Sequence, residues 1–432
     1  MPFSRWHMKA RIVMGSATFF DAFDALSIAF VLPVLAGLWH LSSLEIGFLI
    51  SASYLGQLVG ALVFGQLAER WGRVPSAATA VAIMSVMSLG CILSGSFLAL
   101  FLCRLVQGVG VGGEMPVAAA YISELSRAQG RGRFFLLYEM IFPVGLMVTG
   151  QIGRIVVPLY GWQIMFVIGG IPGLIICLLL LTLPESPRWL IAQGRLRAAE
   201  RIIEQVEAST PRRMPPPSEA PRPRPAEAKR SSWRELLSPV YRRRTLIVWV
   251  LWASAFLVAN SLNNWMPTLY RSIYQLDLKD ALFAASMTNV AQVLVLLVCA
   301  VSIDWIGRRP WMMAAFILGA LLMAVLSVTA HSVAAVMVLA TLAYGVIGSN
   351  NAVVYLYTPE IYPTRMRAIG TGLATSWLRL ASAVGPALVG FMVGQGGIAS
   401  VFVLFAVISA LGAAAASQMI ETRGRQLEEI AA

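Results

Sequence analysis

The chain has 432 residues, of which 58% are hydrophobic and only 12% are charged, and its formal net charge is +12. Soluble domains carry about 25% charged residues, so this composition excludes an ordinary soluble domain and indicates a chain surrounded by lipid. The positive charge does not indicate a nucleic-acid partner, because most Lys and Arg residues lie in short polar segments between long apolar runs.

These apolar runs predict twelve membrane-spanning helices, since a spanning helix needs about 20 apolar residues. The first run is too long for a signal peptide, so we expect none. The expected fold is an all-α membrane protein with two pseudo-symmetric six-helix bundles. The predicted spans are 12–38, 44–68, 75–96, 98–125, 134–158, 162–183, 244–271, 279–303, 310–331, 333–358, 368–393 and 397–419.

The distribution of basic residues predicts the orientation of these spans. If the N-terminus is cytoplasmic, 28 of the 33 Lys and Arg residues fall in cytoplasmic segments, as the positive-inside rule requires. Both termini are therefore expected in the cytoplasm of a bacterium, with the spans in its inner membrane. The five remaining basic residues are Arg104, Arg154, Arg271, Lys279 and Arg379.

Charged residues in the first and fourth spans are candidates for proton coupling, because a charge in the hydrocarbon zone is costly. Asp21 and Asp24 share one face of the first helix. Two close carboxylates in a low dielectric do not both stay ionised easily, so one of them could carry a proton. A structural ion pair with Arg104 is the alternative. Glu114 is a further candidate, although the glycines beside it favour close helix packing.

The segment between the sixth and seventh spans is polar and divides the chain. Ser186–Ala208 has the apolar spacing of an amphipathic helix on the cytoplasmic face, and the proline-rich stretch 211–225 is typical of an extended linker. The expected organisation is an N-terminal bundle over 1–184, the helix and linker over 185–243, a C-terminal bundle over 244–420 and a tail over 421–432.

Charged landmarks recur in the two halves at a nearly constant offset. Glu69 and Asp304 are 235 residues apart, and Glu185 and Glu421 are 236 apart, which indicates an internal duplication. Acids and arginines at these helix ends are expected to form inter-helix ion pairs that hold the two bundles together and break when the inside opens. The predicted gating residues are Glu69, Arg70, Arg73, Glu124, Arg131, Asp304, Arg308, Glu360 and Arg367.

With these motifs the chain resembles the major facilitator superfamily over nearly its whole length. The loop 65–73 resembles the superfamily's loop motif, with Glu69 for the usual Asp, and PESPRWL (184–190) resembles the sugar-porter branch. FDAFD (20–24), GVGGEMP (110–116) and NNAVVYLYTPE (350–360) resemble bacterial niacin transporters, relatives of the synaptic vesicle glycoprotein 2 family and of aromatic-acid symporters. The resemblance implies secondary active transport of nicotinate or a related aromatic acid.

The second half supplies most of the candidate substrate-binding residues. Arg379 lies about eleven residues into its span, roughly 16 Å deep and near the midplane, where a guanidinium requires an anion from the substrate or a neighbouring helix. A flat aromatic acid also needs amide donors and ring surfaces. The further candidates are Phe142, Asn260, Asn264, Trp265, Asn351, Tyr355 and Trp377.

Other functions remain open from the sequence. A polyol, an organic cation or a drug could be the transported solute, and a transporter-like receptor is a third possibility. An enzyme is disfavoured, because no nucleophile–base, metal-ligand or phosphate-loop spacing occurs in the cytoplasmic segments. We expect no cofactor and no metal, a small anionic aromatic substrate with protons as partners, lipid around a monomer, and no nucleic acid.

Overall fold

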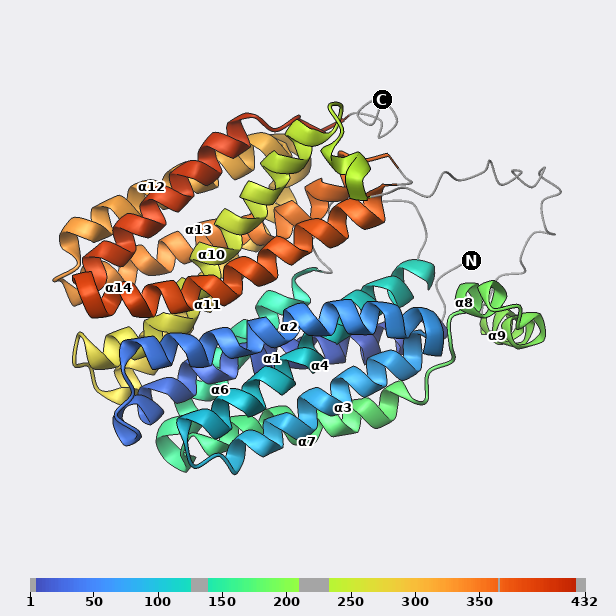
Figure 1. Ribbon diagram of the computed structural model, residues 1–432, viewed down its shortest axis with the longest axis horizontal. Coiled ribbons are helices and arrows are strands. Elements are labelled where there is room, and N and C mark those ends of the chain that lie inside the picture. The colour runs from blue at the N-terminus through green and yellow to red at the C-terminus, as the bar shows by residue number, and fades with distance from the viewer. Residues whose placement is uncertain (1–4, 126–138, 210–232, 364–365, 425–432) are drawn as a thin grey trace.

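The computed structural model describes residues 5–125, 139–209, 233–363 and 366–424, and these are almost entirely helical (Figure 1). Each long helix coincides with one of the apolar runs. The helices are α1 (Arg5–Leu38), α2 (Ser43–Trp71), α3 (Arg73–Ile92), α4 (Phe97–Leu125), α6 (Ile141–Tyr160), α7 (Gln163–Leu180), α8 (Pro187–Ala192), α9 (Leu196–Ala208), η1 (Trp233–Leu237), α10 (Arg242–Ser272), α11 (Leu278–Ile306), α12 (Arg308–Thr329), α13 (Val333–Glu360) and α14 (Arg367–Ser417).

Among the described residues, 11 helices are long and apolar enough to cross a membrane. The last of them, α14, has 51 residues and contains two spans, because the backbone leaves the helical conformation at Gly397 (φ 70°, ψ −179°). A positive φ is readily adopted by glycine, so the loop expected between 393 and 397 is reduced to a kink. The chain therefore makes the twelve crossings that the hydropathy predicts.

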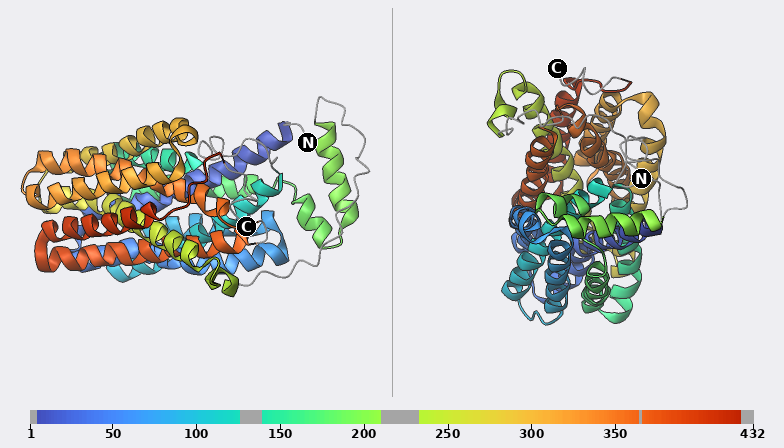
Figure 2. Two further views of the ribbon diagram at one scale, coloured as in Figure 1. Left: turned by 90° about the horizontal axis from the view of Figure 1, so that it is seen from above. Right: turned by 90° about the vertical axis from the view of Figure 1, so that its right-hand side faces the viewer.

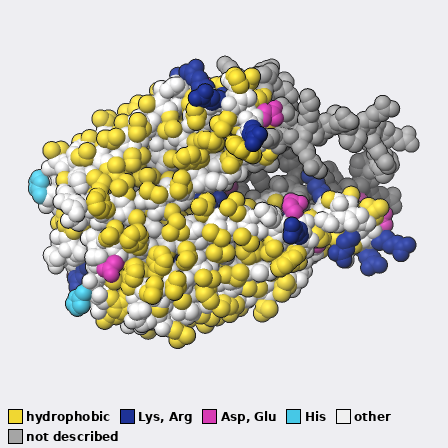
Figure 3. All heavy atoms as spheres, in the orientation of Figure 1, with side chains coloured by type: hydrophobic (Ala, Val, Ile, Leu, Met, Phe, Trp, Pro, Cys, Tyr) yellow, Lys and Arg dark blue, Asp and Glu magenta, His cyan; other side chains and the backbone are white. Residues whose placement is uncertain are grey.

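The crossings form two bundles, α1–α7 and α10–α14 (Figure 1). Apolar side chains cover the flank of the molecule, and basic and acidic side chains gather near the end that carries the termini (Figure 3). In the N-terminal bundle, α2 and α4 pack through small residues. A Cβ on Gly60 would collide with the backbone of Val109, and a Cβ on Gly112 would collide with that of Gln57. The glycines of the fourth span therefore serve close packing, as expected.

The two bundles pack together at the end far from the termini. One apolar core there contains residues of both bundles, such as Leu35 at the end of α1 and Leu269 near the end of α10. At the terminal end the cores are separate: one belongs to the N-terminal bundle, and the other to the C-terminal bundle with the start of α6. The described residues therefore form a molecule that is closed at the far end and divided at the terminal end.

The segment after the sixth span is a pair of short helices, not the single amphipathic helix expected over Ser186–Ala208. Gly194 adopts φ +73° and breaks the helix. Ala199 of α9 then packs against Trp189 and Leu190 of α8, so part of the apolar face is covered by protein. Figure 2 shows α8 and α9 beyond the bundles. The proline-rich stretch 211–225 lies outside the described residues.

Candidate functional site

A cavity of about 90 Å³ lies between the two bundles. One water needs about 10–15 Å³ of such a volume, so the cavity has room for roughly six to nine waters. This space suits a small single-ring molecule. The N-terminal bundle contributes mainly apolar side chains to its wall, and the C-terminal bundle contributes amides and aromatic rings. The amide-bearing residues in the wall are Gln57, Asn260, Asn263, Asn264, Gln292 and Asn351.

Hydrogen bonds hold part of this amide wall in place. Asn263 and Asn289 exchange two side-chain hydrogen bonds of 3.2 Å, and the Tyr344 hydroxyl donates to Gln292 Oε1 at 2.9 Å. Asn264 Nδ2 donates to the Tyr54 hydroxyl at 3.2 Å, which joins α10 to α2 across the two bundles. A wall fixed in this way presents its free polar atoms to a solute without further reorganisation.

Five of the eight predicted substrate residues line the cavity. They are Phe142, Asn260, Asn264, Asn351 and Tyr355. Asn351 Oδ1 is buried without a hydrogen-bond partner, and the Tyr355 ring packs edge-on against Trp252 with 4.5 Å between ring centroids. The cavity therefore offers a free amide oxygen beside a fixed aromatic surface.

The two predicted tryptophans do not line the cavity. Trp265 is 2% exposed, and its Nε1 donates to the Pro386 carbonyl at 3.1 Å. Trp377 packs against Trp249, with ring centroids 5.5 Å apart. Their expected role as substrate contacts is therefore not supported by their position, since both rings pack against other parts of the C-terminal bundle.

Arg379 is not among the residues that line the cavity, and it follows the lining residue Leu378 in α14. The side chain is buried, with 8% of the residue exposed. Its Nη1 donates to the Thr375 carbonyl at 3.4 Å, its Nε has no partner, and no carboxylate among the described residues lies within ion-pair distance. Tyr355 is its electrostatic neighbour. A guanidinium that is always charged thus lies beside the cavity without an anion.

Other lining residues were not among the predicted substrate-binding residues. The sequence marks Glu139 as a charge inside a span and Asn263 as an amide of the seventh span, whereas Tyr54, Gln57, Gln292 and Tyr344 were missed. The sequence holds a signal for two of the missed residues. Tyr54 and Gln57 are polar, lie three residues apart in an apolar span and therefore share a helix face. Glu139 lies within the predicted span 134–158 and precedes α6 by two residues; its charge inside an apolar run is the signal that marks it.

The four predicted coupling residues are buried inside the N-terminal bundle and do not line the cavity. Asp21, Asp24 and Glu114 are 0% exposed, and Arg104 is 1% exposed. The first electrostatic neighbour of Asp21 is Glu114 on α4, ahead of Asp24. Both Asp21 oxygens and Glu114 Oε2 lack a hydrogen-bond partner among the described residues. The close acid pair is therefore Asp21–Glu114 rather than Asp21–Asp24.

Arg104 does not form, in this conformation, the ion pair with the aspartates that was the alternative to proton coupling. Its Nη1 donates to the Asp24 backbone carbonyl at 3.0 Å and to Gln107 Oε1 at 2.7 Å. The Asp24 carboxylate accepts instead from the Ser88 hydroxyl at 3.2 Å. The guanidinium thus fixes the backbone of α1 while both aspartates remain free of an ion pair within the described part of the chain.

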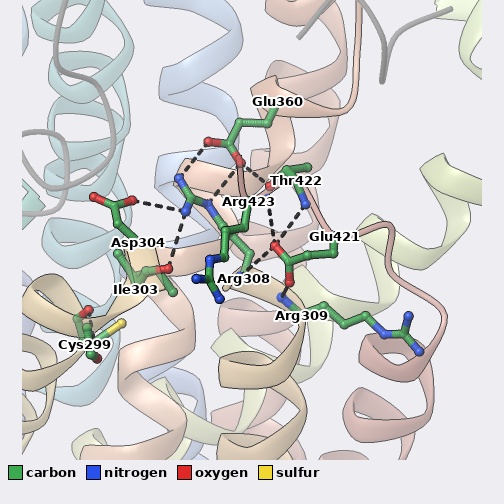
Figure 4. A network of polar contacts seen from close by, with 10 residues as sticks. Cys299, Ile303, Asp304, Arg308, Arg309, Glu360, Glu421, Thr422 and Arg423 are labelled. Atoms are coloured by element: carbon green, nitrogen blue, oxygen red, sulfur yellow. Dashed lines mark hydrogen bonds and ion pairs between the residues drawn. The ribbon is translucent and has the colours of Figure 1, made fainter. Parts of the chain in front are cut away.

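The charged landmarks at the terminal end form a network in the C-terminal bundle (Figure 4). Arg308 pairs with Asp304 at 3.1 Å and with Glu360 at 3.2 Å, which joins α11, α12 and α13. The Glu421 carboxylate accepts from the backbone N–H groups of Arg308 and Arg309 at 3.1 and 3.0 Å. Gly307, at φ +103°, lets the chain pass close to that carboxylate.

The N-terminal bundle repeats this arrangement. Arg73 pairs with Glu69 at 2.9 Å, and Glu185 accepts from the N–H groups of Arg73 and Val74 at 3.0 and 3.1 Å. Gly72 has φ +111°. In each half the acid after the last span therefore caps the helix that follows the loop motif. The 236-residue offset identified Glu185 and Glu421 as equivalent residues but did not predict this capping role.

In the conformation described, whose apolar cores are separate at the terminal end, these pairs do not join the two bundles. Their joining of the bundles when the inside closes stays a prediction. Each ion pair found among the described residues lies within one bundle. Arg367 donates to the Tyr362 carbonyl at 3.0 Å and not to an acid, and Arg70 is exposed. The side chain of Glu124 and all of Arg131 lie outside what the structure describes. Within the described residues no group of three metal-ligating side chains occurs.

Comparisons with known proteins agree with this architecture. Residues 11–432 match the family described as sugar (and other) transporter. The niacin transporter NiaP of Acinetobacter baylyi is 30% identical over 100% of this chain and 98% of that protein, and the 4-hydroxybenzoate transporter PcaK of the same organism is 28% identical over 85% and 81%.

A solved structure shows the same fold. The xylose transporter XylE from E. coli, in a partially occluded inward-open conformation, superimposes with a TM-score of 0.76 at 18% identity, covering 98% of this chain and 100% of that chain. With two bundles, twelve crossings, a central cavity and a family match over nearly its full length, the chain belongs to the sugar (and other) transporter family of membrane transporters.

Proposed function

We propose that this protein imports nicotinate or a related small aromatic monocarboxylate, together with protons, across a bacterial inner membrane with both termini in the cytoplasm. The names of two relatives, which transport niacin and 4-hydroxybenzoate, support this substrate class. The cavity of this chain offers amide groups and aromatic rings that suit such a substrate.

The observation that carries the proposal is the unpaired guanidinium of Arg379. A buried charge without a partner is costly, and the only hydrogen bond of this side chain among the described residues is the 3.4 Å contact with the Thr375 carbonyl. A substrate carboxylate would supply the missing anion, and a planar guanidinium binds a carboxylate through two parallel hydrogen bonds.

The two walls of the cavity suit a flat ring with a polar edge. Leu26, Phe142 and Leu146 offer an apolar surface from the N-terminal bundle, and Asn351 and Tyr355 face it from the C-terminal bundle. Tyr54 and Gln57 add polar atoms to the N-terminal side. The apolar surface together with the Tyr355 ring supports a flat aromatic ring as the ligand.

Proton coupling is assigned to the acid cluster of the N-terminal bundle. Asp21 and Glu114 are fully buried neighbours, and two such carboxylates share a proton more readily than they both ionise. Substrate binding between the bundles and proton binding within one of them would then be linked through the movement of α1 and α4 against the cavity.

Uptake into proteoliposomes tests the proposal. Labelled nicotinate would be supplied with and without an inward proton gradient to wild type, Arg379→Ala and Arg271→Ala. Arg271 is an exposed arginine at the end of α10 and is the matched control. We expect gradient-driven accumulation in wild type and the control and none in Arg379→Ala. Absence of uptake in wild type under every condition refutes the substrate assignment.

An organic cation is the second candidate substrate, because the cavity wall contains a carboxylate, Glu139. In that case Arg379 would be structural. Accumulation of tetraethylammonium in the same vesicles, lost in Glu139→Leu and retained in Arg379→Ala, would replace the aromatic acid by a cation.

A further inference from the structure

Glu139 is the one acidic side chain in the cavity wall among the described residues. It precedes α6 by two residues and is partly exposed to the cavity. The described part of the chain offers this carboxyl group no hydrogen bond and no ion pair. A carboxyl group that lines a cavity and has no partner among the described residues is free to bind a polar atom of a ligand there.

The surroundings of Glu139 show which part of a ligand it faces. Tyr355 has both Glu139 and Arg379 as electrostatic neighbours, and Tyr355 and Glu139 both line the cavity. The other nitrogen- or oxygen-bearing side chains in the wall are uncharged amides and tyrosines, such as Asn351. Under the proposed function the substrate carboxylate binds Arg379, which leaves Glu139 for another polar atom of the ligand.

We propose that Glu139 is a specificity-determining residue that binds a polar atom on the aromatic ring of the substrate. A ring hydroxyl donates a hydrogen bond to the Glu139 carboxylate, and a pyridine nitrogen shares one proton with it. An unsubstituted ring leaves the carboxyl group unsatisfied. This inference rests on the proposed function and narrows it to aromatic acids whose ring carries a nitrogen or a hydroxyl.

The Glu139 carboxyl group discriminates between aromatic acids because it needs a hydrogen-bond partner on the ring. A site that hydrogen-bonds a substrate atom rejects an analogue that lacks the atom, because the buried partner in the site then loses its only contact. Shape alone does not separate these acids, since benzoate, nicotinate and 4-hydroxybenzoate are flat rings of similar size.

Titration calorimetry of the purified protein in lipid nanodiscs tests the inference. Wild type, Glu139→Leu and Phe142→Leu would each be titrated with nicotinate, 4-hydroxybenzoate and benzoate, and melting temperatures would confirm that each variant is folded. Phe142 lies one turn along from Glu139 and also lines the cavity, so it is the control for lost contact area.

We expect wild type to bind the two ring-polar acids about tenfold more tightly than benzoate, which corresponds to about 1.4 kcal/mol. Glu139→Leu should remove this preference by weakening the ring-polar acids and leaving benzoate within about twofold, and Phe142→Leu should weaken all three alike. Equal affinity of wild type for the three acids overturns the inference and leaves the proposed function intact. Failure of wild type to bind any of them overturns both.

Discussion

The cap that Glu421 forms on α12 allows a quantitative test of the packing at the terminal end. Glu421→Ala removes the acceptor of four backbone N–H groups, those of Arg308, Arg309, Thr422 and Arg423, at 2.9–3.1 Å. The first two belong to the start of α12, where the helix dipole adds to the attraction of a carboxylate.

We expect Glu421→Ala to lower the free energy of unfolding by about 2–3 kcal/mol. A hydrogen bond to a charged group contributes about 1.5–3 kcal/mol when buried, but Arg309 is exposed and water replaces part of what is lost. In a domain of 150–250 residues 1 kcal/mol corresponds to about 2–4 °C in Tm, and this chain is longer, so we expect a decrease of roughly 3–6 °C.

The assay is thermal unfolding of purified protein in one detergent, followed by tryptophan fluorescence. Glu207→Ala, on the exposed face of α9, is the control and should leave Tm unchanged. Glu421→Gln keeps one acceptor oxygen without the charge and should show an intermediate decrease. An unchanged Tm in Glu421→Ala would refute the reasoning that this carboxylate holds the end of the last span against α12.

Four further predictions concern packing, recognition and coupling. Gly112→Leu forces a side chain into the backbone of α2 and should abolish the monodisperse peak in size-exclusion chromatography, whereas Gly65→Leu, with open space around it, should not. Trp265→Phe should lower Tm through loss of one hydrogen bond, about 1 kcal/mol, and leave the Kd for nicotinate within about twofold; a larger change in Kd would return Trp265 to the site. Asn351→Ala should weaken nicotinate binding about fivefold to tenfold in calorimetry without lowering Tm, because a free amide contributes about 1 kcal/mol to a ligand. Asp21→Asn should retain nicotinate binding and lose gradient-driven accumulation in proteoliposomes, and accumulation at the wild-type level would exclude this acid from coupling.

The sequence predicted the fold well, because the length and apolar character of each span can be determined from the chain alone. The spans, the duplication and the close packing of the glycine-rich fourth helix follow from apolar length, offset and side-chain size. The break at Gly194 was missed, since the apolar spacing continues across it while the backbone turns.

The site was predicted only in part, because depth in the membrane does not determine which way a side chain points about its helix axis. Trp265 and Asn264 are adjacent and equally deep, yet Asn264 lines the cavity and Trp265 packs against α14. The sequence left an ion pair of Arg104 with a carboxylate open, and the guanidinium binds a backbone carbonyl instead. The residue spacing predicts neither the orientation of Trp265 nor the partner of Arg104, because both depend on how neighbouring helices are rotated about their axes.

The acid cluster lies in the N-terminal bundle and all of the amide wall except Gln57 lies in the C-terminal bundle, and this separation has a consequence for how such a protein can change. Asp21 on α1 and Glu114 on α4 are buried and do not line the cavity, whereas Asn260, Asn263 and Asn351 line it. Under the proposed function, substitutions in the second half would therefore alter which molecule is accepted without touching the proposed proton-binding acids. A descendant of this chain would then change its substrate and keep its coupling ion.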